Sequence, residues 1–227
     1  SQSIAAFPWR SKATGLQNGY LRNSTKVNER QNRRTALRRH QKIHFVFLNL
    51  GHFIDHLLML VFATAAALTL AREWGMSYAE LIPYATPGFV AFGLFSLPAG
   101  WLADKWSREG MMLVFFFGIG ISAVATALAQ SPLQIAFGLF AIGVFGAIYH
   151  PVGIPLVIQG YVKTGLRIAV NGVFGNLGVA SAALLTGYLV DQSGWRSAFI
   201  WPGLVTIVIG VGSVSYTHQP LTTSDLV

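Results

Sequence analysis

The sequence predicts an all-α membrane protein with six transmembrane helices, and three observations lead to this prediction. Of the 227 residues, 53% are hydrophobic and only 11% are charged, whereas soluble domains carry roughly 25% charged residues. After residue 43 the chain resolves into long apolar runs, and a helix that spans a bilayer needs about 20 such residues. Because lipid cannot pair backbone polar groups, helices are the structure that these runs are expected to adopt.

Short polar joints separate the apolar runs and hold most of the charges outside the N-terminal segment. In chain order, the predicted spans are His44–Ala71, Tyr78–Ala103, Met111–Ala129, Pro132–Ile158, Ala169–Val190 and Arg196–Val214. Ser77 and Glu80 precede and open the second span at the spacing of a capping box. This spacing predicts a structural role for Glu80 rather than a role in transport.

The basic residues of the chain are concentrated in residues 1–43, which hold ten of them against one acidic residue. This leader thus carries a charge of +9. Residues 44–214 carry six basic and six acidic residues and are neutral, and Asp225 brings the net charge to +8. The polar composition of residues 1–43 favours a disordered leader over a nucleic-acid-binding arm, and we expect no nucleic-acid partner. The leader also lacks the apolar core of a secretory signal.

The distribution of lysine and arginine predicts the orientation of the spans, because these residues are enriched in cytoplasmic loops. The leader and the joints after spans two and four hold 14 of the 16 basic residues, and only Arg72 and Arg196 fall on the other side. The N-terminus and the 2–3 and 4–5 loops are therefore predicted to be cytoplasmic.

A short string recurs at the ends of the second and fifth spans. Gly100-Trp-Leu-Ala-Asp104 and Gly187-Tyr-Leu-Val-Asp191 share the pattern G-x-L-x-D, 87 residues apart. The charge bias places one copy at the cytoplasmic face and the other at the outer face. Three helices followed by three more, with matching elements at opposite faces, indicate a 3+3 inverted repeat.

The segment that follows the second span, Gly100-Trp-Leu-Ala-Asp104-Lys105-Trp-Ser107-Arg108-Glu109, resembles the 2–3 loop motif of the major facilitator superfamily. Five of its residues fit that motif, namely Gly100, Leu102, Asp104, Lys105 and Arg108, while Ser107 and Glu109 depart from it. The resemblance covers about residues 44–214. It implies the N-terminal half of a twelve-helix fold, in a bacterial inner membrane.

The resemblance also implies a role for the loop residues. In the family this loop joins the two halves through ion pairs and helix-end contacts, so Gly100, Asp104, Lys105 and Arg108 are expected to bias the conformational equilibrium. For Lys105 and Arg108, solvated anchoring at the cytoplasmic face is the alternative.

Within the superfamily, two stretches are most similar to exporters of the fosmidomycin-resistance type: Ile148-Tyr-His150-Pro151 and Gly175-Asn176-Leu-Gly178. Two positions depart from the drug–proton antiporters. Leu139 stands where many members carry an arginine in span four, and Val179 follows Gly178 where the antiporter motif has proline. Membership of the superfamily is therefore the stronger expectation.

Asp55 is the only acidic residue inside an otherwise apolar run, and His52 and His56 share its helix face. A carboxylate within a membrane indicates a functional site, because its burial is costly without a cavity or a partner. Histidine titrates near physiological pH. His150 and His52 both lie roughly 12 Å from the inner ends of their spans, at about 1.5 Å per residue. We predict that these four residues form a proton or substrate site.

Other roles remain open for the same residues. The histidines can instead hydrogen-bond across helix interfaces. Asn171 and Asn176 can bind substrate or cross-link helices, of which cross-linking is favoured, and Asn176 is also assigned to the predicted pathway. A zinc site at His52 and His56 fits the i, i+4 spacing, but the sequence has no H-E-x-x-H string. We therefore expect no metal.

Several classes of activity are excluded by what the sequence lacks. With no cysteine, the chain has no disulfide, no thiol nucleophile and no thiolate metal site. It also contains no G-x-S-x-G elbow, phosphate loop or dinucleotide fingerprint. We predict neither enzyme activity nor a cofactor.

The sequence as a whole predicts a secondary active transporter of a small solute, for uptake or efflux, coupled to protons and working by alternating access. We expect residues 44–214 to lack their C-terminal six-helix partner, and we interpret the polar tail, residues 215–227, as foreign or read-through sequence. The alternative is a six-helix half-transporter or channel that works as a homodimer.

Overall fold

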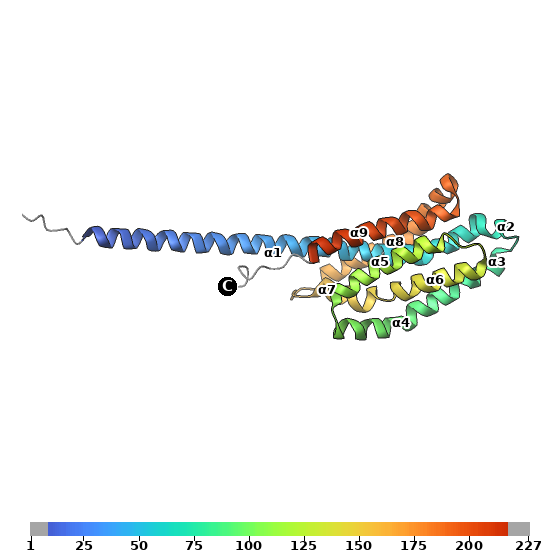
Figure 1. Ribbon diagram of the computed structural model, residues 1–227, viewed down its shortest axis with the longest axis horizontal. Coiled ribbons are helices and arrows are strands. Elements are labelled where there is room, and N and C mark those ends of the chain that lie inside the picture. Colours follow the sequence, from blue (N-terminus) through green and yellow to red (C-terminus); the bar gives the residue numbers. More distant parts are fainter. Residues whose placement is uncertain (1–8, 218–227) are drawn as a thin grey trace, which may run out of the picture. The chain divides into compact units, whose positions relative to one another are not determined.

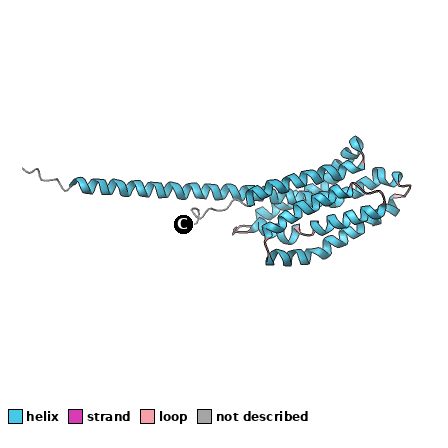
Figure 2. Cartoon of the chain, in the orientation of Figure 1, coloured by secondary structure: helices cyan, strands magenta, loops and turns pink. Residues whose placement is uncertain are grey.

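The computed structural model describes residues 9–217, and these residues form helices joined by short loops (Figures 1 and 2). No strand occurs in this part of the chain. Six of the helical stretches are long and apolar enough to cross a membrane. The prediction of an all-α fold with six spans is confirmed.

The spans follow the predicted order, with three of them built from more than one element. The first comprises α1 (Trp9–Ala65), η1 (Ala66–Leu70) and α2 (Ala71–Glu73), and the second comprises α3 (Tyr78–Leu81), η2 (Ile82–Ala85) and α4 (Thr86–Lys105). The third is α5 (Arg108–Thr126), and the fourth comprises α6 (Pro132–Gly146), η3 (Tyr149–Gly153) and α7 (Ile154–Ile158). The fifth and sixth are α8 (Gly165–Ser193) and α9 (Trp195–Thr217).

Prolines accompany two of the breaks within these spans. Pro83 lies in the tight turn η2, and Pro151 lies in the wide π-helical turn η3. Proline has no backbone N–H, so it interrupts the ladder of helical hydrogen bonds. The break at η3 is the one that positions a predicted site residue, His150.

The capping box at the start of the second span is confirmed. The Glu80 backbone N–H donates to Ser77 Oγ at 3.2 Å, and the Ser77 backbone N–H donates to Glu80 Oε2 at 2.8 Å. Glu80 therefore satisfies helix-terminal groups.

Glycines allow the helix backbones of the bundle to approach closely. A Cβ on Gly120 of α5 would lie 2.9 Å from the carbonyl oxygen of Gly203 in α9. A Cβ on Gly143 of α6 would overlap the carbonyl of Gly88 in α4, and a Cβ on Gly178 of α8 would overlap the carbonyl of Phe53 in α1. Small residues are the usual means of close helix packing in membranes.

Two further close contacts are related by the same shift as the G-x-L-x-D strings. A Cβ on Gly88 would lie 2.8 Å from the Leu139 carbonyl oxygen, and a Cβ on Gly175 would lie 2.7 Å from the His52 ring. Gly175 follows Gly88 by 87 residues, and Leu139 follows His52 by 87 residues. The second span thus contacts the fourth where the fifth span contacts the first, so the two contacts between the sets of three spans occupy equivalent positions, which supports the inverted repeat.

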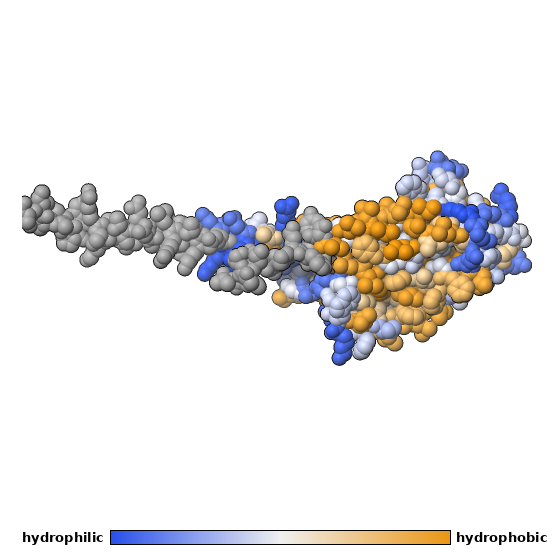
Figure 3. Space-filling view, in the orientation of Figure 1, coloured by the Kyte–Doolittle hydropathy of each residue, from blue (hydrophilic) through white to orange (hydrophobic). Residues whose placement is uncertain are grey.

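The surface of the bundle is apolar between polar ends, as the visible face shows (Figure 3). Among the exposed apolar side chains are Leu97 of α4 and Leu184 of α8. An apolar belt of this kind matches the hydrocarbon core of a bilayer.

The chain divides between Ile43 and His44, so the leader is described by itself. The structure has residues 9–43 as helical, whereas the sequence predicts disorder. Their described side chains are mostly exposed, and a helix without packing is marginal in water. The disordered leader therefore stays a prediction, and residues 1–8 and 218–227 lie outside the described residues.

Candidate functional site

The three polar residues predicted on one face of the first span lie together in α1. Asp55 is completely buried, His52 is buried and His56 is half-buried. The His52 and His56 rings have centroids 5.0 Å apart, as expected for positions one helical turn apart.

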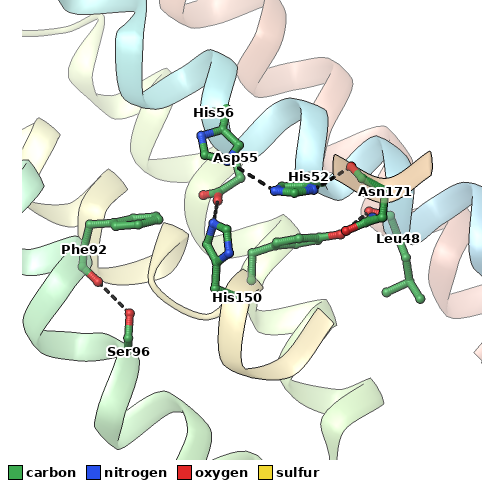
Figure 4. A network of polar contacts seen from close by, with 9 residues as sticks. Leu48, His52, Asp55, His56, Phe92, Ser96, His150 and Asn171 are labelled. Carbon is green, nitrogen blue, oxygen red and sulfur yellow. Dashed lines mark hydrogen bonds and ion pairs between the residues drawn. The ribbon is translucent and has the colours of Figure 1, made fainter. Parts of the chain in front are cut away.

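His150 reaches the same cluster from η3. Its Nε2 lies 3.6 Å from Asp55 Oδ2, and its ring centroid lies 5.3 Å from that of His52 and 5.5 Å from that of His56 (Figure 4). The structure therefore brings together all four of the residues that the sequence predicts for a proton or substrate site. We call them the histidine–aspartate cluster.

Asp55 has little support from its neighbours. Within residues 9–217, neither of its carboxylate oxygens has a hydrogen-bond donor, and the His150 contact is its one close polar neighbour. A Cβ on Gly146 would lie 2.9 Å from Asp55 Oδ1, so glycine leaves the space that the carboxylate occupies. A buried carboxylate without donors is costly, and it persists where it has a function.

His52 is held in one orientation by two contacts outside the cluster. Its Nδ1 lies 2.8 Å from the backbone carbonyl oxygen of Asn171, and its ring stacks on Tyr149 with centroids 4.7 Å apart. Because a carbonyl oxygen only accepts, Nδ1 carries the proton of the neutral ring. His52 Nε2 is then the acceptor of the hydrogen bond that His56 Nε2 donates at 3.2 Å.

A second polar network connects α1, η3 and α8 beside the cluster. Tyr149 Oη donates to the Leu48 carbonyl at 2.7 Å, and Asn171 Nδ2 donates to Tyr149 Oη at 2.8 Å and to Asn49 Oδ1 at 3.0 Å. Sequence reasoning missed Asn49 and Tyr149. The available signals were that Asn49 precedes His52 by three residues and that Tyr149 precedes His150 directly.

Asn176, the remaining predicted pathway residue, is exposed on α8. Asn171, five residues earlier, is the asparagine of α8 that contacts the cluster. Asn171 cross-links helices, as the sequence interpretation favoured. A role for Asn176 stays a prediction.

The predicted loop residues lie at the end of α4 and the start of α5. Arg108 Nη2 contacts Asp104 Oδ1 at 2.9 Å, with 41% of the Arg108 side chain and 68% of the Asp104 side chain exposed. Lys105 is exposed as well. A Cβ on Gly100 would lie 3.2 Å from Pro151 of η3, so the loop motif begins where α4 packs against the fourth span.

At the other end of the bundle, Glu73 and Arg196 connect three of the loops between spans. Trp195 Nε1 donates to Glu73 Oε2 at 2.9 Å, Arg196 Nη1 lies 3.5 Å from Glu73 Oε1, and Arg196 Nη2 donates to the Ala129 carbonyl at 3.2 Å. The 1–2, 3–4 and 5–6 joints therefore share one end, as alternating spans require. The sequence did not predict this contact.

A family model described as Major Facilitator Superfamily matches residues 48–225. The gallate transporter of Pseudomonas putida is 26% identical over 62% of this chain and 32% of its own length. The niacin transporter of Acinetobacter baylyi is 27% identical over 63% of this chain and 33% of its own length. The chain thus spans about a third of the length of the curated relatives it matches.

The fold also matches a solved structure, an inward-facing and unoccupied bacterial homologue of the human lysosomal transporter Spinster. The TM-score is 0.70 at 17% sequence identity, over 80% of this chain and 44% of that protein. At this identity the match shows the fold alone.

Proposed function

Because the chain belongs to the major facilitator superfamily, we propose that it is the N-terminal six-helix half of a secondary transporter that moves a small solute by alternating access. The family match over residues 48–225 is the observation that carries this proposal. It is a family of transporters, which agrees with the expectation that the chain is not an enzyme. The chain is an integral membrane protein with six candidate spans.

Two of the six spans are mostly exposed, which supports a partner that covers them. In the second and fifth spans only 17% and 22% of the most apolar stretch is buried inside the bundle, against 44% to 56% in the other four spans. Transport sites in this superfamily lie at the interface of repeated halves. A C-terminal six-helix half that covers the exposed faces of α4 and α8 is the partner that this pattern favours.

The histidine–aspartate cluster is the proposed proton or substrate site. Asp55 is buried within a span, and His150 on another span is its close polar neighbour at 3.6 Å. Rearrangement of the first span against the fourth would change the exposure of the carboxylate and the distance to its counter-charge. Coupling a proton at Asp55 to such a movement is what proton-driven alternating access requires.

The loop residues have a separate proposed role, in the conformational equilibrium. The Asp104–Arg108 ion pair is exposed and joins the ends of α4 and α5. An exposed pair is worth little to stability, so its value lies in contacts that differ between two conformations. Gly100, Asp104, Lys105 and Arg108 would bias the equilibrium without touching solute.

The proposal includes the orientation of the chain, the membrane in which it lies and the class of solute. The basic leader and the 2–3 and 4–5 loops favour a cytoplasmic N-terminus, and the bacterial relatives favour a bacterial inner membrane. The similarity to fosmidomycin-resistance-type exporters rests only on the stretches at Ile148–Pro151 and Gly175–Gly178. The solutes named for the relatives, gallate and niacin, are the first to assay.

The test measures movement of labelled gallate and niacin, driven by a pH gradient, in proteoliposomes that contain this chain together with the proposed C-terminal six-helix half. We expect Asp55→Asn to reduce gradient-driven transport at least tenfold, because the amide cannot carry the proton. The matched control is Asp191→Asn, which removes an exposed carboxylate whose hydrogen bond is to neighbouring Gln192. Unchanged transport by Asp55→Asn would refute the coupling role.

The same assay separates the proposal from a homodimeric half-transporter or channel. This chain alone is expected not to transport, because the proposed transport site forms at the interface of two six-helix halves. Robust transport by the chain alone would contradict the proposal and establish the homodimer.

A further inference from the structure

We propose that the histidine–aspartate cluster binds a divalent transition-metal ion of the Zn²⁺ type, with His52, His56, His150 and Asp55 as ligands. The inference goes beyond transport, because it requires only that this chain bind the ion. Its support is the geometry of four side chains from two spans.

The distances between the ligand atoms are close to those of an occupied site. Tetrahedral ligands at 2.0–2.1 Å from Zn²⁺ are separated from one another by about 3.3 Å. The Nε2 atoms of His52 and His56 are 3.2 Å apart, and His150 Nε2 and Asp55 Oδ2 are 3.6 Å apart. The ion would take the place of the hydrogen bond between the two rings, with the His56 proton carried on Nδ1 of the same ring. One nitrogen from each of the three histidines lies within 4.8 Å of the others, and Asp55 joins this group through its contact with His150.

His52 is already in the tautomer that a metal requires. Its Nδ1–H donates to the Asn171 carbonyl oxygen at 2.8 Å, which leaves the lone pair on Nε2 directed into the cluster. Metal-bound histidines commonly donate their other ring N–H to a carbonyl or carboxylate, which fixes the ring. The stacking of His52 on Tyr149 holds the ring plane in addition.

Asp55 supplies an independent observation that points to a ligand. Its side chain is fully buried, and both oxygens lack a hydrogen-bond donor within the described part of the chain. A buried carboxylate needs a counter-charge. A divalent cation beside it would provide the charge and the coordination that hydrogen bonds do not provide here.

The ligand types select the class of ion. Imidazole suits zinc, copper, nickel and iron, whereas calcium and magnesium prefer sites made of oxygen ligands. An ion can reach the cluster from the side of His150, whose side chain is 36% exposed. The sequence predicts no metal because an H-E-x-x-H string places its ligands on one helix, whereas here the third imidazole, His150, comes from the fourth span.

The test titrates the purified full chain, free of a polyhistidine tag and in detergent, with Co²⁺, whose visible absorption is intense in tetrahedral sites. We expect about one Co²⁺ per chain, displaced by Zn²⁺ and not by excess Mg²⁺. His56→Gln, His150→Gln and Asp55→Asn should each weaken binding at least tenfold, in line with the 10–100-fold losses seen even for outer-shell changes. The matched control, His40→Gln on the exposed part of α1, should bind as the wild type does.

Circular dichroism and size-exclusion chromatography verify that each variant is folded, and His150→Gln, at a partly exposed position, serves if a buried variant does not fold. Absence of the tetrahedral spectrum in the wild type would overturn the inference. So would binding that the folded cluster variants leave unchanged. Neither result bears on proton-driven transport, which is measured in liposomes without metal.

Discussion

At the scale of single residues, the candidate site depends on an unusual balance around Asp55. Its carboxylate has one close polar neighbour, His150, while the adjacent histidine His52 is fixed by Asn171 and Tyr149. The hydrogen-bonded network thus includes His52 but not Asp55, the group that is proposed to change its protonation or ion-binding state. A fixed frame beside a free carboxylate suits a group that exchanges a proton or an ion.

Tyr149 should be a major contributor to that frame. Tyr149→Phe removes a buried hydroxyl that donates to the Leu48 carbonyl and accepts from Asn171, and it leaves buried polar groups unpaired. We expect a loss of about 1–3 kcal/mol in the free energy of unfolding, measured by thermal or denaturant unfolding in detergent. Tyr188→Phe, at an exposed position on α8, is the control and should change little. Equal stability of the two variants would count against the frame.

The sequence predicts part of this site because helix spacing is a local property. Positions 52, 55 and 56 fall on one face of any helix, and the depth of His150 follows from counting residues along its span. The roles of Asn49 and Tyr149 depend on how α1, η3 and α8 face one another. That arrangement is set by packing between spans, which no local spacing contains.

At the scale of elements, close glycine contacts determine how the spans pack. The contacts at Gly88, Gly120 and Gly178 place backbone against backbone on three pairs of spans. The glycines are visible in the sequence, but their partners are not. Pro151 marks a break in the fourth span, but the sequence does not predict that this break is the π-helical turn η3.

Gly88→Ala tests the packing of α4 against α6. The added methyl group would lie 2.8 Å from the Leu139 carbonyl oxygen, and backbone cannot rotate away as a side chain can. We expect a destabilisation of about 1–3 kcal/mol, measured as a lower midpoint of thermal unfolding. Gly93→Ala on the same helix has no atom within 4 Å of the added group and should be neutral. If Gly88→Ala unfolds at the wild-type midpoint, the close approach is wrong.

At the scale of the whole molecule, the contacts of Glu73 and Arg196 and the alternation of the spans establish that three joints share one end. Which end faces the cytoplasm is a matter of charge. Fourteen of the 16 basic residues fall in the leader and on the side of the 2–3 and 4–5 loops. The six spans and their alternation could be read from hydropathy, whereas the Glu73 contact could not.

Fusions of alkaline phosphatase, which is active only outside the cytoplasm, test this orientation. Activity is expected after Ser77 and after Ser131, which lie in the joints at the Glu73 end. Silence is expected after Ser107 and after Lys163, which lie in the basic joints. The reverse pattern would invert the topology.

The two equivalent contacts at Gly88 and Gly175 have different consequences for the candidate site. Leu139 and His52 occupy equivalent positions, each against a glycine of the neighbouring helix. In one copy the backbone carbonyl of Leu139 lies against Gly88, and in the other the imidazole ring of His52 lies against Gly175 and donates from Nδ1 to the Asn171 carbonyl oxygen. The two copies thus share the position of the contact and differ in its chemistry, because only the His52 copy brings a hydrogen-bonding side chain to the candidate site.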